Sequence, residues 1–168
     1  LQMNHNKEAL LHLTQAIHED EELDEAYLEI AAIYAVEGSK HEAVHHLNKA
    51  IDLDPENPDY LYTAIEIYSK LDLKLNVIET YKKIIKTGYD DGDMFLDYSE
   101  LLIEMDEVND AISVLKSGVE KHPNHEDVQL MLGGYLLAVG EHTAGFEHLI
   151  KAYKIDKEAL KKFTEYFP

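Results

Sequence analysis

Apolar and small residues recur at helical spacing in the segment from residue 24 to residue 57. A spacing of three or four places side chains on one face of a helix, whereas glycine and proline interrupt helices. The segment therefore predicts a helix, a turn, a second helix and a stop. The positions that carry this pattern are, in order, Tyr27, Ile30, Ala31 and Tyr34, the break at Gly38, then Ala43, Leu47 and Ala50, and finally Pro55.

The same pattern returns every 34 residues without insertion or deletion. Counting from Asp24, further units begin at Pro58, Gly92 and Glu126, so the repeats are 24–57, 58–91, 92–125 and 126–159. Residue types agree within each column, and only Gln129 is polar in the first column of large residues, which holds Tyr27, Leu61, Phe95 and Gln129. Small residues in the second half of each unit allow paired helices to approach closely, and large ones fill the space between pairs.

Both ends of the chain carry incomplete units. Residues 1–23 match the second half of a repeat, so the sequence opens on a truncated unit. Leu10, Leu13 and Ile17 then lie on a helical face that expects a covering helix, because one repeat cannot bury its apolar side alone. We expect either an upstream continuation or a second chain to cover it. Residues 160–168 predict a capping helix or the start of a further repeat.

The spacing of large, small and proline positions resembles that of the tetratricopeptide repeat family, whose unit is a 34-residue antiparallel helix pair. The resemblance covers nearly the whole chain. It is clearest in 24–57, which ends with the letters DPEN, and in 92–125, which carries HPN near its end. It implies an all-α fold, a right-handed superhelical solenoid of antiparallel helix pairs that forms one continuous domain.

Charge narrows the classes of partner. The chain has 15 Lys plus Arg against 34 Asp plus Glu, a net charge of -19, and every basic residue is Lys. Such a surface repels phosphate backbones, and forked Arg contacts to bases are absent, so nucleic acid is excluded as a partner. The same charge disfavours anionic membranes. No apolar run approaches the roughly 20 residues of a membrane span, and the first residues lack a signal pattern. We expect a cytoplasmic location, with a signal or domain upstream of Leu1 as the alternative.

Candidate chemistry is sparse. His41 and His45 are four residues apart and share a helical face, but no third ligand joins them and the chain has no Cys, so we predict no metal and no cofactor. Asp90 and Asp91 precede a predicted helix, where carboxylates cap free amides. No phosphate-binding glycine loop or nucleophile motif is present, so we predict no enzymatic activity.

In the tetratricopeptide family the first helices of successive units line a concave groove that holds a peptide or a partner helix, and the resemblance implies the same groove here. Helical periodicity then assigns its lining. A plain solvated surface is the alternative interpretation of these positions. The predicted groove residues are Leu28, Ala32, Tyr62, Glu66, Leu96, Asp97, Glu100 and Leu130.

Some family members bind a chaperone's C-terminal carboxylate at this groove through Lys, Asn and Arg. The matching positions here include Ala32, Thr63 and Asp97, so we predict that this binding is absent. A basic or amphipathic segment fits the lining better. The leading hypothesis is therefore a protein-interaction scaffold. The alternatives are a recruiting or regulatory arm of a larger protein, such as a glycosyltransferase, and a homo-oligomeric assembly module that uses Leu10, Leu13 and Ile17 or the Phe163 and Phe167 end.

Overall fold

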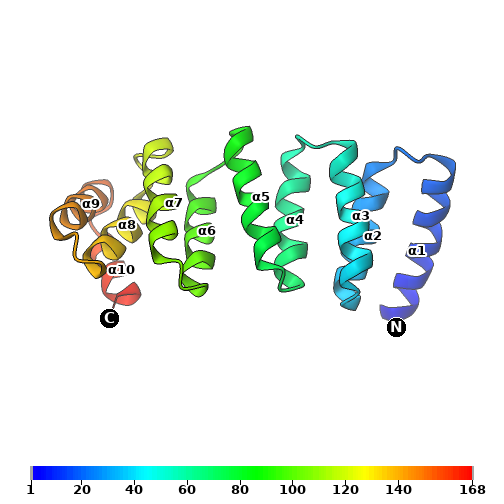
Figure 1. The fold of residues 1–168 in the computed structure, drawn as a ribbon, viewed down its shortest axis with the longest axis horizontal. Helices are drawn as coiled ribbons and strands as arrows, with labels where there is room; N and C mark the ends of the chain where they lie inside the picture. Colours follow the sequence, from blue (N-terminus) through cyan, green and yellow to red (C-terminus); the bar gives the residue numbers. More distant parts are fainter. Residues whose placement is uncertain (1, 168) are drawn as a thin grey trace. The chain divides into compact units, whose positions relative to one another are not determined.

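The computed structural model describes residues 2–167, and the side chains of residues 5–167. Within this part of the chain every regular element is a helix, which confirms the all-α fold class (Figure 1). The helices are α1 (Gln2–Glu19), α2 (Asp24–Glu37), α3 (Lys40–Leu53), α4 (Pro58–Lys70), α5 (Lys74–Thr87), α6 (Gly92–Glu104), α7 (Val108–Lys121), α8 (Glu126–Ala138), α9 (His142–Ile155) and α10 (Ala159–Tyr166).

The chain divides into two compact units, with the boundary between Tyr89 and Asp90. The first contains α1 to α5 and the second α6 to α10. Helices α2, α4, α6 and α8 begin at the four positions where the 34-residue pattern starts. The grouping of these segments into one continuous domain, and the handedness of a superhelix, stay predictions.

Four equivalent turns join the two helices of each pair. The residue in the left-handed conformation is Gly38 in the first (φ 75°), Asp72 in the second (φ 55°), Asp106 in the third (φ 64°) and Gly140 in the fourth (φ 88°). These positions are 34 residues apart. Gly adopts this conformation without strain, and Asp tolerates it better than most residues do. The repeat is therefore preserved in backbone geometry even where the residue type changes.

Small residues bring the helices of a pair together. In α2 and α3, Ala31 and Ala43 are fully buried. In the second unit, a Cβ added at Gly118 of α7 would lie 2.9 Å from Cβ and Cγ of Phe95, which is itself fully buried. Helices α8 and α9 cross with Gly133 against Gly145, where an added Cβ would meet the partner's carbonyl oxygen at 3.0 Å or less. Such contacts are closer than side chains permit.

Gln129, the one polar residue in its column, is buried, and both its amide nitrogen and its amide oxygen are hydrogen-bonded. Its Nε2 donates to the Pro123 carbonyl oxygen at 2.9 Å, and its Oε1 lies 2.7 Å from Nδ1 of His148 in α9. Because an amide oxygen only accepts, Nδ1 of His148 carries the proton. Burial first, and then the charge of Lys151, lowers the pKa of His148. Gln129 therefore forms a hydrogen bond that links α8 to α9.

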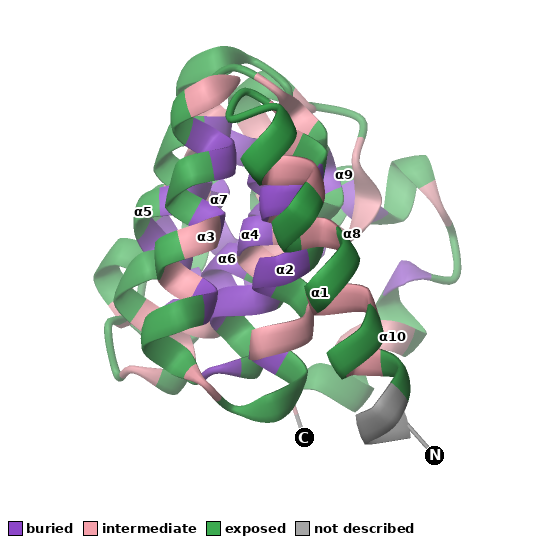
Figure 2. Ribbon diagram, turned by 90° about the vertical axis from the view of Figure 1, so that its right-hand side faces the viewer, coloured by how far each residue is buried: buried purple, intermediate pink, exposed green. Residues whose placement is uncertain are grey.

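Helix α1 packs against α2 with one face, and its opposite face is exposed. None of its described side chains is buried, and Figure 2 shows its ribbon in the colours of intermediate and exposed residues. Leu10, Leu13 and Ile17 are half-buried. Leu11, by contrast, is 58% exposed. The face predicted to need a cover is therefore partly covered within the chain, and its use as an oligomer face stays a prediction.

Candidate functional site

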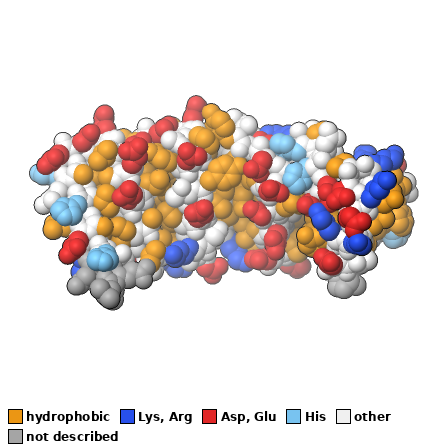
Figure 3. All heavy atoms as spheres, turned by 180° about the vertical axis from the view of Figure 1, so that it is seen from behind, with side chains coloured by type: hydrophobic (Ala, Val, Ile, Leu, Met, Phe, Trp, Pro, Cys, Tyr) orange, Lys and Arg blue, Asp and Glu red, His pale blue; other side chains and the backbone are white. Residues whose placement is uncertain are grey.

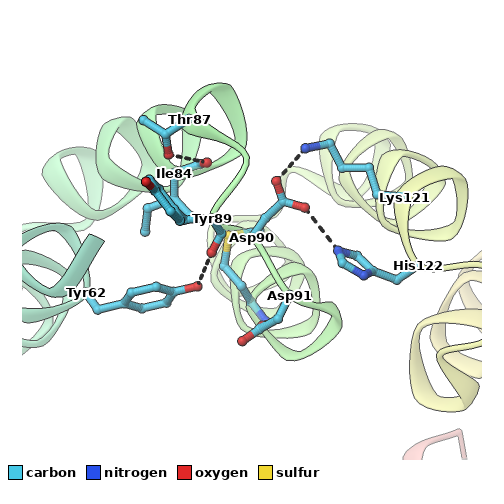
Figure 4. Close-up of polar contacts among 9 residues, drawn as sticks. Tyr62, Ile84, Thr87, Tyr89, Asp90, Asp91, Lys121 and His122 are labelled. Carbon is cyan, nitrogen blue, oxygen red and sulfur yellow. Dashed lines mark hydrogen bonds and ion pairs between the residues drawn. The ribbon is translucent and has the colours of Figure 1, made fainter. Parts of the chain in front are cut away.

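The predicted groove residues of the first unit lie on two neighbouring helices. Leu28 and Ala32 are one turn apart on α2, and Tyr62 and Glu66 are one turn apart on α4, which packs against α2. Ala32 and Glu66 are exposed, whereas Leu28 and Tyr62 are half-buried. The Tyr62 hydroxyl donates to the carbonyl oxygen of Tyr89 at 3.0 Å (Figure 4). This bond fixes the Tyr62 ring while leaving part of its surface accessible.

The second unit contains a pocket built on α6 and α8. It has a volume of about 260 Å³, and two predicted residues, Leu96 and Glu100, line it. Met131 and Tyr135 of α8 supply further apolar surface, and α8 also contributes the carboxylate of Asp127. Tyr166 from α10 completes the lining. Figure 3 shows acidic side chains set among apolar ones on the face drawn.

Leu130 does not belong to an accessible surface. It is fully buried in a cluster with Leu149, Ala152 and Ala159, against which Phe163 packs. Helical periodicity placed Leu130 in the groove, because it shares a column with Leu28, Tyr62 and Leu96, which are half-buried in this structure. Here α10 packs on α8 and covers that position. Without exposed surface Leu130 cannot contact a partner, and it is removed from the predicted set.

Helix α10 binds α8 through a basic side chain and aromatic rings. Nζ of Lys162 lies 2.7 Å from Oε1 of Glu126 and 3.0 Å from Oδ1 of Asp127, and these two hydrogen bonds raise the pKa of Lys162. The ring of Phe167 stands edge-on to Tyr135, with centroids 5.3 Å apart. It also occupies the space that a side chain at position 134 would fill, since a Cβ added at Gly134 would lie 2.1 Å from the ring.

The carboxylates of α6 repel one another. Partial burial first, and then Glu100, Asp93 and Asp91, raises the pKa of Asp97. Burial, followed by the charge of Glu100, raises the pKa of Tyr135 in the pocket. Among the described residues no cation pairs with Asp97 or Glu100. A bound cation at this face would relieve that repulsion.

The acidic residues before α6 have structural roles. Asp91 caps the helix, since its Oδ1 accepts from the Met94 amide at 2.8 Å, as predicted. The Asp90 side chain, only 4% exposed, instead pairs with Lys121 and with Nε2 of His122, the latter at 3.0 Å (Figure 4). Burial alone would raise the pKa of Asp90, but the bonds to Lys121 and His122 outweigh it and lower the pKa.

Metal and membrane features are absent from the part of the chain that the structure describes. No group of three or more His, Cys, Asp or Glu residues there could hold a metal ion. His41 and His45 are exposed and line a surface hollow between α3 and the start of α5. His46 instead stacks on the rings of Tyr27 and Tyr34. No helix of the described residues is long and apolar enough to cross a membrane.

Comparison with known proteins identifies the architecture. The sequence matches no family model and no curated protein. Solved structures do match. YrrB, described as a TPR protein with an unusual peptide-binding site, is 21% identical over 86% of this chain and 75% of its own, with a TM-score of 0.60. The fold is that of the tetratricopeptide repeat proteins.

MamA structures extend this likeness over nearly the whole chain. One is 17% identical and covers 95% of this chain and 94% of its own, with a TM-score of 0.66. Another, MamA 41-end from Desulfovibrio magneticus RS-1, is 16% identical and covers 94% of this chain and 89% of its own, with a TM-score of 0.61. The predicted helical repeat solenoid is thereby confirmed as a fold. At these identities the likeness concerns fold alone.

The predicted groove residues include only Leu96 and Glu100 of the six residues that line the pocket. Asp127 stands in a column with Glu25, Asp59 and Asp93, all acidic, and that signal was available in the repeat. Tyr135 lies on the same helix as Met131 but faces the pocket from beside the predicted column. Tyr166 belongs to α10, outside the repeated units, so no periodic pattern could place it.

Proposed function

We propose that this chain is a protein-interaction scaffold that binds a basic or amphipathic segment of a partner and performs no chemistry. The binding positions are the accessible ones on α2 and α4 in the first unit and on α6 and α8 in the second. One observation supports the proposal: next to the half-buried Leu96, Asp97 and Glu100 have no cation partner among the residues that the structure describes. Carboxylates beside apolar surface suit a segment that offers both cations and apolar side chains. A cytoplasmic location is part of the proposal.

The net charge of -19 supports a positively charged partner segment. A field of this sign attracts cationic segments over a distance of about 8–10 Å at physiological salt and speeds their association. It repels acidic peptides and nucleic acids. The solved structure of YrrB, a TPR protein with a peptide-binding site, supports the use of this fold for peptide binding.

Selection from a random peptide display library tests the proposal. We expect the selected peptides to be basic with apolar residues at regular spacing, and their binding to weaken as salt rises. The double variant Asp97→Lys plus Glu100→Lys should abolish that binding. Asp52→Lys plus Glu120→Lys is the matched control, because it makes the same charge change at exposed positions on α3 and α7. Salt-independent binding that survives the first double variant unchanged would falsify the proposal.

Self-assembly is a second candidate function, favoured by an exposed apolar stripe on α9. Phe146, Ile150 and Tyr153 share a face of that helix and are 57%, 52% and 43% exposed. In the earlier units the column of Ile150 holds the polar residues Asn48, Lys82 and Lys116. An exposed apolar stripe is suited to packing against another copy of the chain.

Light scattering over a range of protein concentrations tests self-assembly. A rise in mass with concentration that Phe146→Ser plus Ile150→Lys suppresses would support it. A monomer at every concentration would exclude it.

A further inference from the structure

The pocket of the second unit is lined by three kinds of side chain. Leu96 and Met131 provide flexible apolar surface, Tyr135 and Tyr166 provide aromatic rings, and Glu100 and Asp127 provide carboxylates. Its volume of about 260 Å³ falls below the roughly 300–1,000 Å³ of pockets that hold drug-sized ligands. The size therefore suits one side chain of a larger partner.

The charge of Glu100 favours a cationic ligand in the pocket. Glu100 is exposed and has no cation partner among the described residues, and its charge acts on Asp97 and on the hydroxyl of Tyr135. Asp127 shares Lys162 with Glu126 through a single oxygen, Oδ1. Lys162 also shows that the neighbouring acid pair on α8 accepts a cationic side chain. An anionic or purely apolar ligand would desolvate the carboxylate of Glu100 without supplying a compensating charge.

The shape of the lining favours a planar cation with an apolar stem. A guanidinium group presents five N–H donors in a fixed fork and stacks on aromatic rings, so it can contact a carboxylate and a tyrosine face together. Its methylene stem would lie on Leu96 and Met131. An ammonium group offers a compact charge but no plane to stack.

We propose that this pocket binds the side chain of an arginine from a partner protein, as the anchor of the bound segment. The inference rests on the proposed function and names the residue that the second unit recognises. The chain contains no Arg. None of these 168 residues can therefore supply the guanidinium, and the proposal commits to an arginine of a partner protein as the occupant.

Nuclear magnetic resonance titration of the full chain with three short peptides tests this proposal. The probes are the acetylated and amidated sequence Ala-Leu-Arg-Leu-Ala and its forms with citrulline or lysine in place of arginine. Citrulline keeps the shape of arginine without the charge. We expect the arginine peptide to shift the amide resonances of Leu96, Glu100, Met131 and Tyr135, the lysine peptide to bind more weakly, and the citrulline peptide to leave them unmoved.

Substitution of the pocket carboxylate provides the matched test. Glu100→Gln keeps the shape of the side chain, and it should weaken the arginine peptide about fivefold to tenfold. Glu120→Gln, an exposed position on α7, should leave the affinity unchanged. Tyr166→Ala should weaken binding of the arginine peptide more than binding of the lysine peptide, because only the guanidinium group stacks on the Tyr166 ring.

Three results would overturn the inference: equal binding of the arginine and citrulline peptides, shifts confined to residues outside the pocket, or no shift at millimolar arginine peptide. If peptides from the display library still bind on α6 in that case, the scaffold function stands and only the arginine anchor is wrong. If the library yields no basic peptide, the scaffold function itself fails.

Discussion

Nδ1 of His148 donates to Oε1 of Gln129 across 2.7 Å, and this bond joins α9 to α8 inside the second unit. The other end of the Gln129 amide is held by Pro123 O. Both groups of the buried amide are thereby satisfied. The polar residue that interrupts an apolar column is thus part of the core, because burial of an amide is tolerated when both of its ends are bonded.

Removal of His148 should destabilise the fold. His148→Ala leaves the buried Oε1 of Gln129 without a donor, so we expect a loss of about 1–3 kcal/mol in unfolding free energy. Urea denaturation at neutral pH measures it. Lys151→Ala, at an exposed position of the same helix, is the control and should change stability little. Equal losses in the two variants would contradict a structural role for the bond.

The same histidine makes stability depend on pH. Its pKa is lowered in the folded state, chiefly by burial, so the unfolded chain takes up a proton first as the pH falls. The contribution of His148 to the free energy of unfolding should therefore be fully present above about pH 6.5 and decrease below it. His46, whose pKa is also lowered by burial and then by His45, adds to this decline. In His148→Ala the decline between neutral and mildly acidic pH should be shallower. An unchanged slope would show that His148 does not contribute.

Substitutions at Gly38, in the turn after α2, should destabilise the protein to different extents. No atom lies within 4 Å of a Cβ added at Gly38, so a substitution there meets only backbone strain at φ 75°. Gly38→Ala should cost about 1–2 kcal/mol. Gly38→Asp should cost less, because Asp72 and Asp106 adopt the same conformation in the equivalent turns. Thermal unfolding of the two variants provides the comparison, and an Asp variant less stable than the Ala variant would count against it.

Close approach at Gly118 should be intolerant of a methyl group. The added Cβ would press on Phe95, so Gly118→Ala should cost about 1–3 kcal/mol despite the higher helix propensity of alanine. Ser117→Ala, one position earlier on α7, is the control and should be neutral or slightly stabilising. A Gly118 variant as stable as the control would show that the helices can separate without loss.

The helix starts could be predicted because one residue column repeats four times, so each unit supports the register of the others. The hydrogen-bond and ion-pair partners of side chains on different helices could not be predicted from the sequence. Gln129 and His148 are 19 residues apart and Asp90 and Lys121 are 31 apart, and no periodic pattern links them. Leu130 was misplaced for a related reason, since its burial depends on where α10 packs. The pocket needed Tyr166, whose position follows from the same helix.

We propose that a partner's basic segment binds at the carboxylates of α6. Isothermal titration calorimetry with the strongest display-selected peptide tests it most directly, on the wild type, on Asp97→Lys plus Glu100→Lys and on the control pair Asp52→Lys plus Glu120→Lys. We predict that the wild type and the control bind alike, that affinity falls at least about tenfold between about 0.05 and 0.5 M salt, and that the α6 variant does not bind. Equal affinity in all three proteins at both salt concentrations would contradict the claim.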